Sequence, residues 1–183
     1  MKFLLFLALN LLGPRLTSDM ARKKSLATLM ESIEKTGGTA YELLAMLVID
    51  YFECGLGHTP DERRHVHNSP YCVPFGLMSA RDAASHGIDT AAGIALHSIR
   101  WGRDVCTERF RRMCRTKWPR RIRAQCDTLE APPEMWLGFY HTGRCEADSY
   151  SDREAALLNR LTLRIHVPVM GELLACTRQS VGE

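Results

Sequence analysis

Long hydrophobic runs are scarce in this chain of 183 residues. The longest, residues 3–12, holds about ten residues, whereas a helix that crosses a bilayer needs about twenty. No internal repeat and no low-complexity stretch stands out, which argues against a repeat protein. A strong charge of one sign is also lacking, because the formal net charge is only +3. Hydrophobic residues make up 45% and charged residues 25%, which is typical of a globular protein.

The length suits one domain of ordinary size and is too short for two comfortable ones. Lys2 precedes the apolar run, and Gly13-Pro14 follows it. A short apolar run behind a basic residue is typical of a secretory signal, so we expect residues 1–18 to be a signal peptide and the protein to be exported, periplasmic or extracellular. Ser18 is the cleavage point in that interpretation. The alternative is an overlong start, with the protein beginning at Met20.

The cysteine content supports export, because it is high for a reduced cytosolic protein. Six of the seven cysteines can form three disulfides, and the sequence does not choose between their pairings. The simplest odd one is Cys176, near the C-terminus. The alternative is a set of buried free thiols. The seven are Cys54, Cys72, Cys106, Cys114, Cys126, Cys145 and Cys176.

The N-terminal half predicts two helices that precede a loop. Residues 22–36 form an amphipathic helix that ends at Gly37-Gly38, because leucine, methionine and isoleucine recur there at helical spacing. Residues 39–42 have the form of a capping box, in which Thr39 and Glu42 satisfy amides at a helix start. The helix over residues 43–53 is apolar nearly all round, which predicts a buried central helix.

The remainder also predicts a mainly α protein, with at most a small hairpin around residues 71–78. Residues 58–75 read as a loop, since histidines and prolines stand there without periodicity. Gly87 and Pro119 are expected to interrupt helices, and Ser151 is expected to cap one. Helices are expected over residues 79–86, 90–101, 103–126, a stretch that starts near Glu134, and 151–165.

One ionisable residue, Glu53, interrupts the apolar helix near its end. Its neighbours Tyr51 and Phe52 disfavour a charged carboxylate by excluding water. The C-terminus of a helix also carries partial negative charge, which opposes a second negative charge there. A carboxyl that keeps its proton near neutral pH can act as a general acid. The alternative is a Glu at a helix end that points into water.

Three short motifs resemble those of lytic transglycosylases and goose-type lysozymes. Glu53-Cys54-Gly55 resembles the Glu-Ser-Gly segment that ends their catalytic helix. Gly76-Leu77-Met78-Ser79 is similar to Gly-Leu-Met-Gln, and residues 90–96 resemble the helix that follows it. Phe139-Tyr140-His141-Thr142-Gly143 is similar to Ala-Tyr-Asn-x-Gly. The motifs occur in family order and cover roughly residues 38–165; Cys54, Ser79 and His141 replace the family's Ser, Gln and Asn.

The resemblance implies a single helical, lysozyme-like domain over residues 38–165 with a substrate cleft, between a helical segment at 19–37 and a tail at 166–183. It implies a monomer that cleaves the MurNAc-GlcNAc β-1,4 bond of peptidoglycan strands without a cofactor. Glu53 donates a proton to the glycosidic oxygen and then acts as a base, and Tyr140 positions or hydrogen-bonds its carboxyl. The implied substrate-binding residues are Gly76, Leu77, Met78, Ser79, His141 and Gly143; ordinary core packing is the alternative for Leu77 and Met78.

The resemblance to lytic transglycosylases implies a reaction without a second carboxylate, because the substrate's acetamido group and 6-hydroxyl complete it and give a 1,6-anhydro product. If Asp61, Glu62 or Asp82 faces Glu53 across the cleft, plain hydrolysis of the goose-type lysozyme kind becomes the better interpretation. A third alternative is a catalytically inactive, cationic module that binds cell wall.

Two other patterns carry alternatives. The residues Cys54, His58, His65, His67 and Cys72 are zinc-ligand types, but their spacing fits no standard site, so exposed loop histidines or a Cys54–Cys72 disulfide are weighed against a metal, and no metal is predicted. The segment 100–123 is strongly basic and holds Trp101 and Trp118. It fits contact with an anionic cell-wall polymer better than nucleic acid, and a solvated helix face is the alternative.

Overall fold

The computed structural model describes residues 8, 20–54, 75 and 80–165, and it describes residues 20–25, 54 and 80–86 by their backbone alone. The described part is helical and contains no strand, which confirms the mainly α prediction for these residues. The hairpin expected around residues 71–78 and the signal peptide expected at 1–18 lie outside the described residues, apart from Phe75 and Ala8. Within the described part, no helix combines the length and apolarity that a membrane crossing requires.

The N-terminal pair of helices agrees with the sequence. Helix α2 spans Met20–Lys35 and α3 spans Ala40–Cys54, with Gly37 at φ 69° in the turn between them. The expected capping box is present, since the Thr39 amide donates to Glu42 Oε2 at 2.7 Å and the Glu42 amide donates to Thr39 Oγ1 at 3.3 Å. Every residue from 41 to 50 is buried, so α3 is the predicted core helix.

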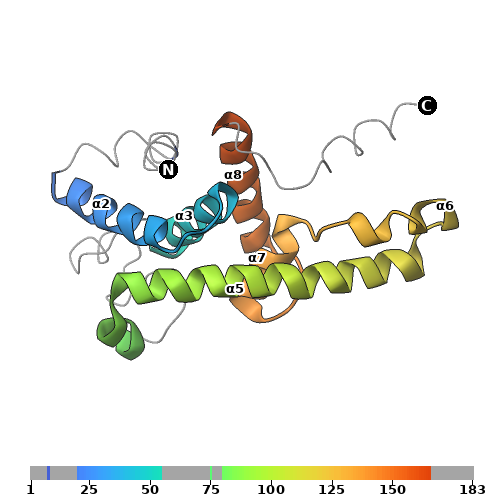
Figure 1. Cartoon of the computed structure of the whole chain (residues 1–183), viewed down its shortest axis with the longest axis horizontal. Helices are drawn as coiled ribbons and strands as arrows, with labels where there is room; N and C mark the ends of the chain where they lie inside the picture. The colour runs from blue at the N-terminus through green and yellow to red at the C-terminus, as the bar shows by residue number, and fades with distance from the viewer. Residues whose placement is uncertain (1–7, 9–19, 55–74, 76–79, 166–183) are drawn as a thin grey trace.

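Helix α5, Ala80–Lys117, runs the length of the molecule in Figure 1 and packs against α2, α3 and α7. Gly87 interrupts it as expected, with φ 71° and ψ 167°. The segments 90–101 and 103–117, expected as separate helices, form one continuous helix. Gly102 does not end this helix. A glycine suits the position because α7 lies so close that a Cβ would stand 3.0 Å from the Phe139 ring.

Pro119 does end the basic helix. The short helix α6, Arg120–Arg123, and the 3₁₀ turn η3, Cys126–Thr128, follow and lead the chain back along α5. Two disulfides fix this return: Cys114–Cys126 ties η3 to α5, and Cys106–Cys145 ties the middle of α5 to the turn after α7. Disulfide formation is therefore confirmed for four of the seven cysteines. The other three, Cys54, Cys72 and Cys176, are not described at the side-chain level.

The last two helices form the platform for the site. Helix α7, Pro133–Thr142, begins one residue before the start expected near Glu134, and Gly143 caps its end. Helix α8, Ser149–Ile165, packs on both α3 and α7. The prediction that Ser151 caps α8 is wrong. Asp148 is the cap, because its Oδ1 accepts the amides of Tyr150 and Ser151 at 3.0 and 2.7 Å, and the Ser151 hydroxyl accepts the Asp148 amide in return at 2.8 Å.

Candidate functional site

A cluster of ionisable and aromatic side chains gathers where α3 ends. Helix α3 contributes Glu53, the end of α7 contributes Tyr140 and His141, and the first turns of α8 contribute Tyr150 and Glu154. The three helices meet because α8 packs on both α3 and α7, so residues nearly a hundred positions apart become neighbours. Two of the three motifs singled out in the sequence therefore converge.

Glu53 sits at the edge of this cluster, with 27% of its side chain exposed. Its Oε1 accepts a hydrogen bond of 3.1 Å from the Tyr150 hydroxyl and lies 3.4 Å from His141 Nδ1. The Tyr150 ring packs edge-on against Phe52 with centroids 5.7 Å apart. An aromatic wall thus holds a carboxyl that still reaches the surface, which is the placement a proton donor to an external substrate requires.

His141 has a carboxylate on each side. Its Nε2 lies 2.7 Å from Glu154 Oε2, and its Nδ1 faces Glu53. Burial by itself lowers the pKa of His141, but the hydrogen bond and charge of Glu154, with the charges of Glu53 and Asp148, outweigh it and raise the pKa above its ordinary value. The ring is fixed by edge contacts with Tyr150 and Tyr140, at centroid distances of 5.0 and 5.4 Å.

Glu154 is the most unusual member of the cluster, because its side chain is completely buried. Its Oε2 meets His141, and within the described part of the chain its Oε1 has no hydrogen-bond partner. Burial raises the pKa of this carboxyl, and the neighbouring charges of Glu53 and Asp148 add to the rise despite the opposing effect of His141. An unsatisfied buried carboxyl is costly, so its retention needs a reason.

Tyr140 has a different partner from the one expected. Its hydroxyl donates to the Phe75 carbonyl at 2.8 Å, and the Phe75 amide in turn donates to Asp50 Oδ1 at 3.0 Å. Burial raises the pKa of Tyr140 well above its ordinary value, and the charge of Glu53 adds to the effect. The hydrogen bond to Glu53 that the sequence analysis assigned to Tyr140 comes from Tyr150 instead. Tyr140 anchors the residue that stands immediately before the Gly76-Leu77-Met78-Ser79 motif.

Phe75 is itself held in a strained conformation. It is fully buried and has φ 61°, which is uncommon for a residue with a Cβ. The hydrogen bonds from Tyr140 and to Asp50, together with burial of the ring, oppose that strain. Such conformations persist only where the surroundings determine them, and they concentrate at functional sites. Residues 76–79, which the sequence analysis assigns to the sugar cleft, lie outside the described residues.

A cavity of about 510 Å³ lies on the other side of Phe52, and none of the five residues of the cluster lines it. Phe52 belongs both to its wall and to the ring contact with Tyr150, and the Arg153 guanidinium lies over the Tyr150 ring at 5.5 Å from the centroid. The wall therefore combines aromatic faces with guanidinium groups on the side of α8. The residues that line it are Tyr51, Phe52, Arg153, Ala156, Leu157 and Arg160.

Gly143, predicted to bind substrate, has a structural role that the sequence analysis did not assign. It ends α7 in the left-handed conformation, with φ 71° and ψ 12°, and its amide donates to the Phe139 carbonyl at 2.8 Å. A glycine fits because this conformation is strained for other residues. This role does not test substrate binding, so the assignment of Gly143 to the sugar cleft stays a prediction.

The metal and second-acid alternatives fall mostly outside the described residues. The side chains of Cys54, His58, His65, His67 and Cys72 are not described, nor are those of Asp61, Glu62 and Asp82. Among the described residues, no group of three or more histidine, cysteine or acidic side chains has an arrangement suited to a metal ion. The acids that could face Glu53 are likewise not placed.

Tyr150 and Glu154 were not predicted as site residues, although their spacing on α8 indicates both. The apolar stripe of α8 runs through Leu158 and Leu161, and Glu154 falls on the same stripe four residues before Leu158. An acidic residue inside an apolar stripe indicates a buried partner. Tyr150 stands four residues before Glu154 and so shares its face.

No family model, curated protein or solved structure matches this chain. The geometry of the cluster is therefore what bears on function.

Proposed function

We propose that the protein is an exported, peptidoglycan-cleaving lytic transglycosylase with one lysozyme-like domain, whose catalytic acid is Glu53. The observation that carries the proposal is the position of Glu53. It stands one residue before the end of the buried helix α3, remains partly exposed and contacts both Tyr150 and His141, and its neighbour Phe52 lines a cavity. Two of the three motifs that resemble this family meet at that point.

In the proposed reaction, Glu53 gives its proton to the glycosidic oxygen, and the bond between this oxygen and C1 of the MurNAc ring breaks. The acetamido oxygen of the same sugar bonds to C1 and balances its positive charge. Glu53, now a carboxylate, removes the proton of the 6-hydroxyl, whose oxygen then displaces the acetamido oxygen. The product is a 1,6-anhydro sugar, and Glu53 regains its proton.

The surroundings of Glu53 suit a glycan better than a small ligand. Aromatic faces such as those of Tyr51 and Phe52 can pack on the apolar faces of sugar rings, and Arg153 and Arg160 can pair with the carboxylates that peptidoglycan carries on its lactyl groups and stem peptides. The disulfides fit an oxidising compartment, which supports export.

The second acid of the cluster, Glu154, bears on the choice between the lyase reaction and hydrolysis. Glu154 is completely buried, and the His141 ring stands between it and Glu53. It therefore does not face Glu53 across a substrate, as the second carboxylate of a hydrolytic pair does.

Clearing of a purified peptidoglycan suspension tests the proposal. The wild-type protein is expected to lower the turbidity, and Glu53→Gln is expected to abolish the effect while the protein stays folded. Glu31→Gln, the same chemical change at an exposed position on α2, is the matched control and should clear at the wild-type rate. If wild type and both variants bind peptidoglycan but none clears it, the protein is an inactive cationic binding module.

A further inference from the structure

The arrangement of His141 requires one proton more than a neutral imidazole between two carboxylates would carry. Both ring nitrogens face carboxyl oxygens, at 2.7 Å from Glu154 Oε2 and 3.4 Å from Glu53 Oε1. A neutral imidazole carries a hydrogen on only one nitrogen, and an ionised carboxylate only accepts. The three groups must therefore share one additional proton, and when Glu154 accepts from Nε2 this proton lies between His141 Nδ1 and Glu53.

We propose that His141 and Glu154 are positioning residues, through which Glu53 shares its catalytic proton with the His141 ring. This inference rests on the proposed function of Glu53. Glu154 fixes the ring by accepting from Nε2, so that Nδ1 stays aimed at Glu53. The proton leaves this pair for the glycosidic oxygen, leaving a Glu53 carboxylate beside a neutral His141, and the proton of the 6-hydroxyl later returns to the same pair.

The environment of Glu154 supports a positioning role over simple packing. Its side chain has no exposed surface, and its Oε1 is unsatisfied within the described residues, so the carboxyl carries a cost that an apolar residue would not. The one side-chain hydrogen bond that Glu154 makes with a described residue is to His141. A buried carboxylate that orients an imidazole and favours its protonated form is a general way to prepare a proton carrier.

The other titratable groups near His141 do not replace Glu154 in this role. Tyr140 and Tyr150 stay neutral, because burial raises the pKa of both hydroxyls. Asp148 acts on the ring through its charge, and it is occupied as the cap of α8. Of the described residues, the remaining charged groups that act on this neighbourhood are Asp50, through Tyr140, and Arg153, through Tyr150.

Nitrogen NMR of the full-length protein tests the sharing without any need for activity. The His141 signals are identified by comparison with His141→Asn, which introduces the residue that the resembling family has at this position. The ordinary pKa of a histidine is about 6.5, and we expect the His141 ring to titrate above it. Glu154→Gln should lower the pKa of His141 by roughly one unit. Glu154→Asp should restore part of the shift, because it restores a carboxylate.

The pH dependence of turbidity clearing gives the second readout. Glu154→Gln should move the alkaline limb of the rate profile to lower pH with little effect on binding to peptidoglycan. An ordinary His141 titration in the wild type, or one that Glu154→Gln leaves unchanged in a folded protein, would overturn the inference. A protein with the expected titration but no clearing would instead sink the proposed function and leave the sharing intact.

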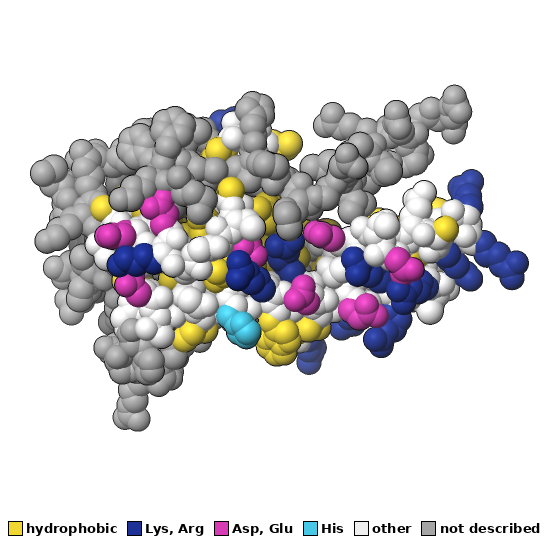
Figure 2. Space-filling view, viewed as in Figure 1, with side chains coloured by type: hydrophobic (Ala, Val, Ile, Leu, Met, Phe, Trp, Pro, Cys, Tyr) yellow, Lys and Arg dark blue, Asp and Glu magenta, His cyan; other side chains and the backbone are white. Residues whose placement is uncertain are grey.

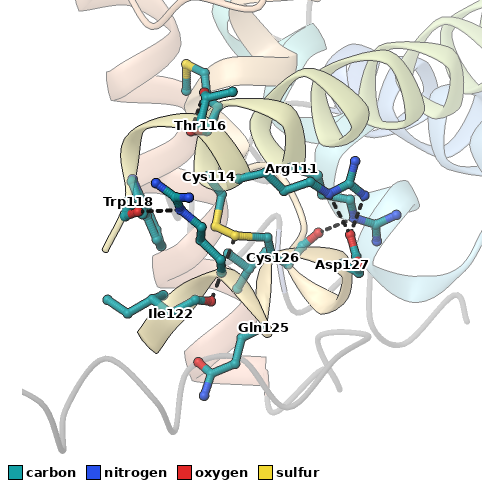
Figure 3. Close-up of a disulfide and its surroundings, with 12 residues drawn as sticks. Arg111, Cys114, Thr116, Trp118, Ile122, Gln125, Cys126 and Asp127 are labelled. Carbon is teal, nitrogen blue, oxygen red and sulfur yellow. Dashed lines mark hydrogen bonds and ion pairs between the residues drawn. A yellow bond between two sulfur atoms is a disulfide. The ribbon is translucent and has the colours of Figure 1, made fainter. Parts of the chain in front are cut away.

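A different observation concerns the far end of the molecule. The segment 112–123, here called the basic tip, spans the end of α5 and the whole of α6, and residues 109–123 include no acidic residue. Dark blue side chains gather at this end in Figure 2. Figure 3 shows how the Cys114–Cys126 disulfide closes the tip, with Trp118 and Ile122 on one side and Asp127 on the other.

Only part of the basic segment 100–123 is available for a partner. Arg100 and Arg103 pair with Glu42, Arg109 pairs with Glu146, and Arg115 pairs with Asp127. The Arg111 and Arg123 side chains each donate to a backbone carbonyl, of Leu129 and Trp118 respectively. Within the segment 100–123, the exposed cations that make no ion pair with a described residue all belong to the basic tip: Arg112, Lys117, Arg120, Arg121 and Arg123.

We infer that the basic tip binds a linear anionic cell-wall polymer with repeated phosphate groups. Most of these available cations are arginines, whose planar guanidinium matches phosphate oxygens in pairs. The disulfide that holds the tip persists in oxidising compartments, which disfavours a nucleic acid inside the cell. A lipid surface is disfavoured because the tip adds little apolar area: Trp118 is 36% exposed and packs on Phe110.

Binding of the full chain to poly(glycerol phosphate) tests this surface. The double variant Arg120→Gln/Arg121→Gln should bind at least tenfold more weakly at low salt and lower the slope of log affinity against log salt by about two. The matched control, Arg144→Gln/Arg164→Gln, removes two exposed arginines elsewhere and should bind as the wild type does. Equal losses in both variants, or tighter binding to duplex DNA or to phosphatidylglycerol vesicles, would overturn the inference.

Discussion

The two ends of helix α3 carry the same side chain in opposite surroundings. At the start, Glu42 is nearly buried and accepts two hydrogen bonds from Arg100, at 2.9 and 3.0 Å. The hydrogen bonds from Arg100, with those from Thr39, lower the pKa of Glu42 to about 2 despite the opposing effect of burial. At the end, Glu53 contacts His141 and Tyr150, and a second acid, Glu154, lies on the other side of the His141 ring.

The difference separates a structural acid from a chemical one. Glu42 caps α3 and joins it to α5, so its charge is fully compensated and remains fixed. Glu53 contacts groups that can exchange a proton, and it remains partly exposed. Sequence alone marks both as glutamates at helix ends, and only the neighbours brought by α5, α7 and α8 distinguish them.

The largest expected effect is on activity at the Glu53 end. Glu53→Gln keeps the shape of the side chain and removes the transferable proton, so the clearing rate should fall by ~10²–10⁴-fold. The melting temperature should stay within a few degrees of the wild type, because Glu53 neither caps a helix nor fills the core. Near-full activity in a folded Glu53→Gln variant would remove the contrast between the two ends.

The next largest effect should be a loss of stability that involves the surroundings of both Glu42 and Glu53. The Cys106–Cys145 disulfide ties α5, which pairs with Glu42, to the turn between α7 and α8, which surround Glu53. The double variant Cys106→Ser/Cys145→Ser should lose about 3–4 kcal/mol of unfolding free energy, as expected for a loop of 39 residues. Urea unfolding measures the loss.

Thiol counting on denatured, unreduced wild-type protein should find at most three free thiols of seven. Six or seven free thiols would contradict both disulfides.

At the Glu42 end the effect should be on stability alone. Glu42→Gln should cost about 2 kcal/mol, the magnitude of hydrogen bonds to a charged group. This is less than the pKa shift taken at face value, because Arg100 is half exposed and water screens the pair. Activity per folded molecule should be unchanged. Because folding lowers the pKa of Glu42, its contribution is present above pH 4.5 and is lost as the pH falls towards 2. Acid unfolding in which wild type and Glu42→Gln lose stability equally would refute this account.

The smallest expected effect separates two tyrosines. Tyr150→Phe removes the hydrogen bond to Glu53, worth about 1 kcal/mol, and should slow clearing roughly fivefold with little change in melting temperature. Tyr140→Phe removes the bond to Phe75 and should lower the melting temperature as well. If the two variants behave alike, the distinction drawn between a residue that contacts the acid and one that anchors the backbone is wrong.

The sequence predicted most of the helical framework and part of the site. Periodicity located α2, α3, α7 and α8, and the Thr39–Glu42 pattern predicted the cap, because these features depend on residues near one another in the chain. The continuity of α5 through Gly102 and the capping of α8 by Asp148 depend on tertiary packing and on competition between neighbouring caps. Local patterns therefore misjudged both.

The site shows the same division. The apolar helix and the resemblance singled out Glu53, Tyr140 and His141, and the structure brings these residues into one cluster. The roles of Tyr150 and Glu154 arise from the packing of α8 across α3 and α7, which no local pattern encodes. The exchange of partners between Tyr140 and Tyr150 has the same origin.

Mass spectrometry of the muropeptides released from purified peptidoglycan tests the central claim most directly. The account predicts fragments that end in 1,6-anhydro-MurNAc, released by the wild type and Glu31→Gln and absent with Glu53→Gln. Fragments with hydrated, reducing ends would contradict the lyase reaction and indicate hydrolysis. Fragments released equally by Glu53→Gln would contradict the assignment of Glu53 as the acid.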